Sequence, residues 1–132
     1  MEPINIAVIG LGNMGLLHSK WLKRSDRYRL IAVADVDESR TASVAEEGIR
    51  AFSSGSALLR SKAMRASLEA VLIATPHYDH TVLGIKALNQ GFNVLIEKPI
   101  SVDKRDAERL LAAHAGTNLV FGAMFNQRVH PA

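Results

Sequence analysis

With 132 residues, no cysteine and 48% hydrophobic and 22% charged residues, the chain fits one domain with a substantial core, and it excludes disulfides and thiolate chemistry. The net charge of +3 comes from basic residues scattered without interleaved aromatic ones, which argues against nucleic acid as a partner. No apolar run reaches the ~20 residues of a membrane span and the start lacks a signal-peptide pattern, so we expect a cytoplasmic protein with no membrane partner.

Apolar segments alternate with amphipathic ones along the whole chain, which predicts strands and helices in turn. The expected strands are Ile4–Ile9, Leu30–Ala34, a short one near Arg50–Phe52, Ala70–Ala74, Val94–Ile96 and Leu119–Gly122. The expected helices are Asn13–Arg24, Glu38–Glu47, Ser56–Arg65, His80–Asn89 and Asp103–Ala115. Helical spacing in the last of these predicts a buried stripe made of Ala107, Leu110, Leu111 and Ala115.

This βαβ alternation predicts an α/β fold, a doubly wound parallel sheet of the Rossmann type with three α/β/α layers. Ligands of such sheets bind at the carboxyl ends of the strands, at the point where the strand order reverses. We therefore expect functional residues directly after strands, and each candidate below lies there.

The first predicted turn carries the glycine pattern Gly10-Leu11-Gly12-Asn13-Met14-Gly15 between a strand and a helix. This context is typical of a cradle for a dinucleotide pyrophosphate. Gly10 allows a sharp turn, Gly12 leaves room for a phosphate, and Gly15 lets the helix pack close to the sheet. The free N–H groups of the helix start then face the anion, so Asn13 and Met14 join the predicted cofactor site. A tight turn without a ligand is the alternative.

An acidic residue closes the second predicted strand. Asp35 lies 20 residues after Gly15, where an acid accepts hydrogen bonds from ribose hydroxyls and repels a 2′-phosphate. Asp37 either adds a second negative charge or caps the next helix. Arg40 is either a solvated helix residue or a partner for such a phosphate. The two acidic residues outweigh the single arginine, so we expect NAD rather than NADP as the cofactor.

Thr75 and Pro76 end the fourth long strand, where a threonine and backbone groups are placed to touch the ribose or pyrophosphate of the cofactor. His80 follows at a helix start and is either a packing residue or part of the cofactor site. With His77 and Asp79 it also suggests a metal site, but no further ligand cluster is evident and we expect no metal.

Glu97, Lys98 and Pro99 follow the next strand. A lysine at the carboxyl end of a strand is either an ordinary surface residue or, beside a nicotinamide, a group that exchanges a proton with a substrate hydroxyl. We place Glu97 and Lys98 in the cofactor site and Lys98 in the catalytic role. Asn126 and Arg128, past the last strand, either face the nicotinamide or the substrate or form a polar exit of the chain, and we include Arg128 in the cofactor site.

These motifs, in this order, resemble the glucose–fructose oxidoreductase / inositol dehydrogenase / MocA (Gfo/Idh/MocA) family over essentially the whole chain. The resemblance rests on the glycine turn with His18, Ala34–Asp37, Thr75-Pro76 with His80, Glu97-Lys98-Pro99, and Asn126 with Arg128. It implies an NAD- or NADP-dependent oxidoreductase acting mostly on sugars, polyols and related compounds. It also implies that Lys98 contacts the nicotinamide ribose and the substrate hydroxyl, and that the Lys98–Pro99 bond is cis.

Members of that family continue into a second α/β domain, which holds the catalytic His or Asp, most of the substrate pocket and most of the oligomer interface. The resemblance therefore assigns residues 1–123 to the dinucleotide-binding domain and 124–132 to the start of a connection. His130 lies too early to match the acid–base partner. We expect this chain to bind the cofactor but to convert substrate poorly or not at all. Apolar surface that is exposed without the second domain is compatible with a homo-oligomer.

Two alternatives to this function stay open. One is a free-standing dinucleotide-binding or regulatory module. The other is a family member with different NAD-assisted chemistry, such as glycoside hydrolysis or tetrapyrrole reduction.

Overall fold

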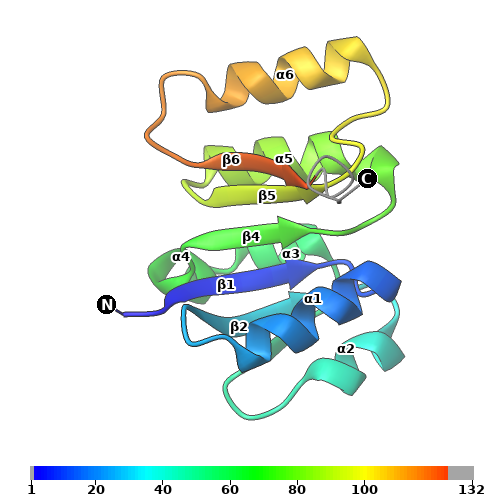
Figure 1. The fold of residues 1–132 in the computed structure, drawn as a ribbon, viewed down its shortest axis with the longest axis vertical. Helices are drawn as coiled ribbons and strands as arrows, with labels where there is room; N and C mark the ends of the chain where they lie inside the picture. The colour runs from blue at the N-terminus through cyan, green and yellow to red at the C-terminus, as the bar shows by residue number, and fades with distance from the viewer. Residues whose placement is uncertain (1, 125–132) are drawn as a thin grey trace, which may run out of the picture.

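A computed structural model describes residues 2–124 of the chain. These residues form one parallel six-stranded sheet between two layers of helices (Figure 1). The strands are β1 (Ile4–Ile9), β2 (Tyr28–Ala34), β3 (Arg50–Phe52), β4 (Ala70–Ile73), β5 (Asn93–Glu97) and β6 (Phe121–Met124). The helices are α1 (Asn13–Arg24), α2 (Glu38–Val44), α3 (Gly55–Arg60), α4 (Lys62–Ser67), the 3₁₀ turn η1 (His77–Asp79), α5 (His80–Asn89) and α6 (Lys104–His114). The predicted three-layer fold is confirmed.

The order of strands across the sheet is β3-β2-β1-β4-β5-β6. Ile6 of β1 pairs with Leu30 of β2 on one side and with Ala70 of β4 on the other. The strand order therefore reverses between β1 and β4. A crevice is expected at the carboxyl ends of these two strands, because the segments that follow them leave toward opposite faces of the sheet.

Two apolar cores lie on opposite faces of the sheet. Side chains from α3, α4, α5 and α6 build the first core, and side chains from α1 and α2 build the second. Residues of β1 alternate between them: Ala7 and Ile9 belong to the first core, and Ile6 and Val8 to the second. Because both faces are covered, the strands are apolar along nearly their whole length, as is typical of parallel sheets.

Two predicted helices differ from the observed ones by more than one residue. The expected helix Ser56–Arg65 is two helices, because the backbone of Ser61 is extended (ψ 126°) and its hydroxyl accepts a hydrogen bond from the Met64 N–H at 3.3 Å. Helix α2 ends at Val44 and not at Glu47, because the chain turns into extended backbone at the next residue and forms a short bridge before β3.

The last predicted strand was misplaced by two residues, since β6 begins at Phe121 and not at Leu119. Before it, the Val120 N–H donates to the side-chain oxygen of Asn93, and the Leu119 carbonyl accepts from the ring of His114. The Val120 carbonyl accepts from the Val94 N–H at 2.9 Å, so the side-chain bond to the Val120 N–H marks the point where the β5–β6 ladder begins.

The predicted stripe on α6 was also wrong in part, because Leu110 is buried and Leu111 is 56% exposed. Among residues 2–124, no helix combines the length and the apolar character that crossing a membrane requires.

Candidate functional site

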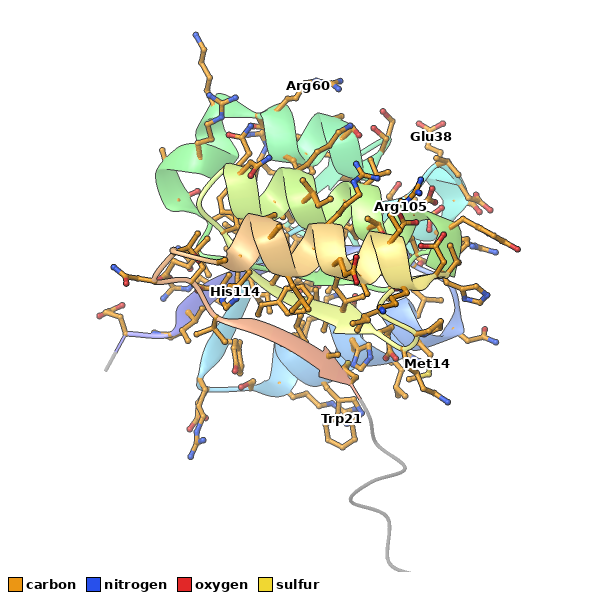
Figure 2. The ribbon with its side chains drawn as sticks, turned by 90° about the horizontal axis from the view of Figure 1, so that it is seen from above. Met14, Trp21, Glu38, Arg60, Arg105 and His114 are labelled. Carbon is orange, nitrogen blue, oxygen red and sulfur yellow. The ribbon has the colours of Figure 1, made fainter. Side chains whose placement is uncertain are left out.

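A cleft of about 670 Å³ opens at the carboxyl ends of β1, β2 and β4, where the strand order predicts it. Figure 2 shows Met14, one of its lining residues, at the edge of the molecule toward which the strand arrows point. The residues of the sequence-predicted site that line this cleft are Gly10, Gly12, Asn13, Met14, Asp35, Thr75 and Pro76. The structure thus brings together most of the predicted site from three separate segments.

The three glycines of the turn have different surroundings. Gly10 has a φ of +93°, and a Cβ there would lie 2.6 Å from the Thr75 nitrogen. At Gly15 a Cβ would lie 1.8 Å from the Gly10 carbonyl oxygen, so α1 packs against the turn only because this residue has no side chain. At Gly12 a Cβ would meet nothing within 4 Å, because this glycine faces open space on the cleft.

The start of α1 offers unused hydrogen-bond donors to the cleft. Gly12 is the N-cap residue, no side chain of the described residues caps the helix, and the first turn contains no acidic residue. The N–H groups of this turn and the positive end of the helix are therefore available to an anion. On the part of the lining next to Gly10, the buried Thr75 hydroxyl has no hydrogen-bond partner within residues 2–124. Such a group is costly unless a ligand satisfies it, so the helix start and this hydroxyl both fit a phosphate- and ribose-bearing ligand.

Asp35 is held by the backbone on both sides. Its two carboxylate oxygens accept hydrogen bonds at 2.7 Å from the N–H groups of Leu11 and Asp37. The side chain is 9% exposed and still borders the cleft. Because a carboxylate offers about four acceptor positions, these two bonds leave capacity for a ligand hydroxyl. Asp35 therefore also ties the end of β2 to the glycine turn, a contact that the sequence did not predict.

Asp37 caps α2, which was one of its two predicted roles. Its carboxylate accepts hydrogen bonds from the Ser39 N–H at 3.0 Å and from the Ser39 hydroxyl at 2.6 Å. These bonds to Ser39 are the main cause that lowers the pKa of Asp37, with a smaller effect of the Arg40 guanidinium. Arg40 lies 3.6 Å from the carboxylate of Asp37 and 4.0 Å from that of Asp35, and it borders the cleft.

His80 lies behind the cleft rather than on its surface. Its ring is 1% exposed, with Nδ1 2.6 Å from the Pro99 carbonyl oxygen and Nε2 2.8 Å from that of Thr75. Both ring nitrogens are therefore occupied by backbone groups. Within the described chain, no group of three or more His, Asp or Glu side chains is arranged to hold a metal ion.

Glu97 forms a contact that sequence reasoning missed. Its Oε1 lies 2.5 Å from Nε2 of His18, and each of the two side chains is 13% exposed. The pair joins α1 to the end of β5, next to the exposed Lys98. The Lys98–Pro99 bond is cis, as the family resemblance implied. Asn126 and Arg128 lie outside the described residues.

The cleft also contains residues that were not predicted. Ser54, Ser56, Val82 and Leu83 line the side next to β3 and α5. The first two follow the short strand Arg50–Phe52, and their position at the carboxyl end of a parallel strand was the signal available in the sequence. The last two had no such signal, because their place on the cleft depends on how α5 packs.

Comparison with known proteins decides the family. A family model described as "Oxidoreductase family, NAD-binding Rossmann fold" matches residues 4–125. The chain belongs to the Gfo/Idh/MocA family. The matched residues include the glycine turn, Asp35 and the Glu97-Lys98-Pro99 motif.

Members of the Gfo/Idh/MocA family similar to this chain include two curated dehydrogenases. UDP-N-acetylglucosamine 3-dehydrogenase of Acidithiobacillus ferrooxidans is 36% identical over 133 residues, which cover 100% of this chain and 40% of that protein. Inositol 2-dehydrogenase of Rubrobacter xylanophilus is 41% identical over 110 residues, covering 82% of this chain and 30% of that protein.

A similar solved structure is that of the WlbA dehydrogenase of Chromobacterium violaceum in complex with NADH and UDP-GlcNAcA. It matches with a TM-score of 0.86 and 25% identity, over 97% of this chain and 36% of the solved chain. The present chain therefore spans well under half the length of the relatives that it matches.

Proposed function

We propose that this chain is the cofactor-binding part of an oxidoreductase that transfers hydride between a nicotinamide dinucleotide and a sugar, polyol or related hydroxyl or carbonyl substrate. The observation that carries the proposal is a cleft lined by a helix start and by a buried hydroxyl, neither of which has a side-chain or hydrogen-bond partner within residues 2–124. The named activities of the similar dehydrogenases support the substrate class.

The glycine turn binds the pyrophosphate in this proposal. The open side of Gly12 admits a phosphate, and the N–H groups at Asn13 and Met14 donate to it. Thr75 donates its hydroxyl to an oxygen of the ligand, which removes the cost of a buried unpaired group. The bound cofactor itself supplies the hydride donor or acceptor.

We further propose a preference for NAD over NADP. Within residues 2–124, the carboxylates of Asp35, on the cleft, and Asp37, beside it, pair with one guanidinium, that of Arg40, so this end of the cleft keeps a negative charge. A 2′-phosphate would bring more negative charge to the same place, whereas ribose hydroxyls find acceptors there.

Lys98 is the residue we propose to act on the substrate. It follows β5, two strands from β1 in the sheet, and its side chain is exposed. Because Glu97 is engaged with His18, the ammonium group of Lys98 is left to orient a substrate hydroxyl and exchange a proton with it. Arg128 and the domain boundary at 123 stay predictions.

A parallel titration with NADH and NADPH tests the cofactor proposal, followed by energy transfer from Trp21, the single tryptophan. We expect tighter binding of NADH. Tighter binding of NADPH would refute the preference, and binding of neither would refute the cofactor role.

Asp37→Asn is the matched variant for the preference, because asparagine still caps a helix while the charge is lost. We expect this variant to reduce the difference between the binding affinities for NADH and NADPH. Glu38→Gln removes a charge one residue further along, on a residue that forms no ion pair with Arg40 among residues 2–124, and is expected to leave the difference in affinity unchanged.

A further inference from the structure

The ring of His80 is held between two groups that can only accept hydrogen bonds. Nδ1 lies 2.6 Å from the Pro99 carbonyl oxygen and Nε2 lies 2.8 Å from the Thr75 carbonyl oxygen. A neutral imidazole carries one N–H and one lone pair, so only one of these contacts can be a hydrogen bond. In the other, the lone pair of nitrogen would face the lone pairs of oxygen at the same short distance.

A ring with a proton on both nitrogens satisfies both contacts. Each N–H then donates to one carbonyl, and both bonds are strengthened by the positive charge. Carbonyl oxygens cannot reverse their role as a hydroxyl or a water can, so no rearrangement of the partners removes the conflict of the neutral form.

Burial and the helix dipole oppose this charge. The ring is 1% exposed and belongs to the first residue of α5, at the positive end of that helix. The titratable groups on the segments around it include Asp79, directly before it, and His77, whose ring centroid is 6.4 Å away, with Tyr78 between these two. On the other segment they include Lys98, directly before Pro99, and Glu97, which is paired with His18. In the part of the chain that the structure describes, no carboxylate bonds the ring. The two charge-assisted hydrogen bonds are therefore the interactions that stabilise the positively charged ring.

We propose that His80 is a positioning residue which, in its doubly protonated form, fastens the segment after β4 to the segment after β5. The first segment carries Thr75 and the second carries Lys98, so one side chain fixes the distance between two parts of the site. The consequence for catalysis rests on the proposed function, whereas the protonation state of the ring does not.

Nitrogen NMR of the ¹⁵N-labelled chain at pH 7 tests the proposal directly. A neutral imidazole carries a proton on only one ring nitrogen, so the two forms of the ring give different nitrogen spectra. We expect both ring nitrogens of His80, assigned sequentially in the wild-type chain, to show directly bonded protons. A neutral ring with one protonated nitrogen would overturn the proposal, whether or not the chain binds a dinucleotide.

His80→Gln tests the fastening, with His77→Gln as a matched control at an exposed neighbour. We expect His80→Gln to shift the amide signals of Thr75, Lys98 and Ile100 and to weaken NADH binding by about two- to tenfold, the loss of one buried hydrogen bond. The control is expected to do neither. Unchanged amide signals in a folded His80→Gln chain would contradict the proposal.

If His80→Gln does not fold, raising the pH of the wild-type chain until the ring loses a proton gives the same comparison. The amides of Thr75, Lys98 and Ile100 must then shift together with the ring nitrogens. Deprotonation without such a shift would overturn the fastening role, while failure of NADH to bind would count only against the proposed function.

Discussion

A methyl group added at Gly15 would lie 1.8 Å from a backbone oxygen, while one added at Gly12 would meet no atom within 4 Å. We expect Gly15→Ala to lose about 3 kcal/mol or more of unfolding free energy, because backbone cannot move aside as a flexible side chain can. Gly12→Ala is expected to stay within about 1 kcal/mol of wild type, since φ at this N-cap is ordinary for alanine. Urea unfolding measures both.

The variants Gly15→Ala and Gly12→Ala also distinguish an effect on folding from an effect on cofactor binding. In Gly12→Ala the new methyl group occupies the space that we assign to a phosphate, so NADH should bind at least about tenfold more weakly although the chain is stable. NADH affinity equal to that of wild type would show that no phosphate approaches this glycine.

Asp37 predicts a pH dependence of stability. Its pKa is lowered in the folded chain from an ordinary value of 3.8, so the folded state favours the charged form. The resulting stabilisation is complete above that value and is lost as the pH falls through the lower, folded pKa. We expect wild type to exceed Asp37→Asn in urea midpoint at neutral pH and the difference to vanish in acid. A difference that persists in acid would contradict this assignment.

At the scale of elements, the break between α3 and α4 depends on one hydroxyl. Ser61 accepts a hydrogen bond from the Met64 N–H, which caps α4. We expect Ser61→Ala to cost about 1 kcal/mol of stability in urea unfolding. Ser67 bonds back to the Ala63 carbonyl within the same helix, so Ser67→Ala is the control and should cost less than about 0.5 kcal/mol. Equal losses would argue against the cap.

Local patterns predicted those elements that local forces determine. The bounds of β1 and α1 agree with the prediction, because apolar alternation and the glycine turn lie within the segment itself. The break at Ser61 was missed, since the apolar spacing of Leu58, Leu59 and Met64 continues through it. The start of β6 was missed for a different reason: Val120 is held by Asn93, which is 27 residues away.

The candidate site also contains residues that local sequence predicts and contacts that depend on distant parts of the chain. Asp35 and the glycine turn could be predicted, because their spacing along the chain reflects the strand–helix–strand unit. The partners of His18 and His80 could not, since each ring contacts groups that only the assembled sheet brings together, at separations of 79 and 19 residues.

For the whole molecule, cofactor binding should appear as added stability. At 100 times its dissociation constant a ligand that binds only the folded state adds about 2.7 kcal/mol, which raises Tm on the order of 10 °C for a domain of this size. We expect NADH to raise Tm more than NADPH does at equal concentration, and Gly12→Ala to reduce both shifts. A larger shift with NADPH would contradict the proposed preference.

The strand order also determines when this chain can fold during synthesis. β1 is translated first yet lies at the centre of the sheet, and its partner in β4 begins at Ala70, 64 positions after Ile6. At 5–20 residues per second, the ribosome leaves one edge of β1 without its partner for roughly 3–13 s. The cleft lies across this junction and has walls from both sides. A nascent chain therefore cannot capture a dinucleotide between these walls until β4 emerges, so ligand capture can only follow completion of the sheet centre.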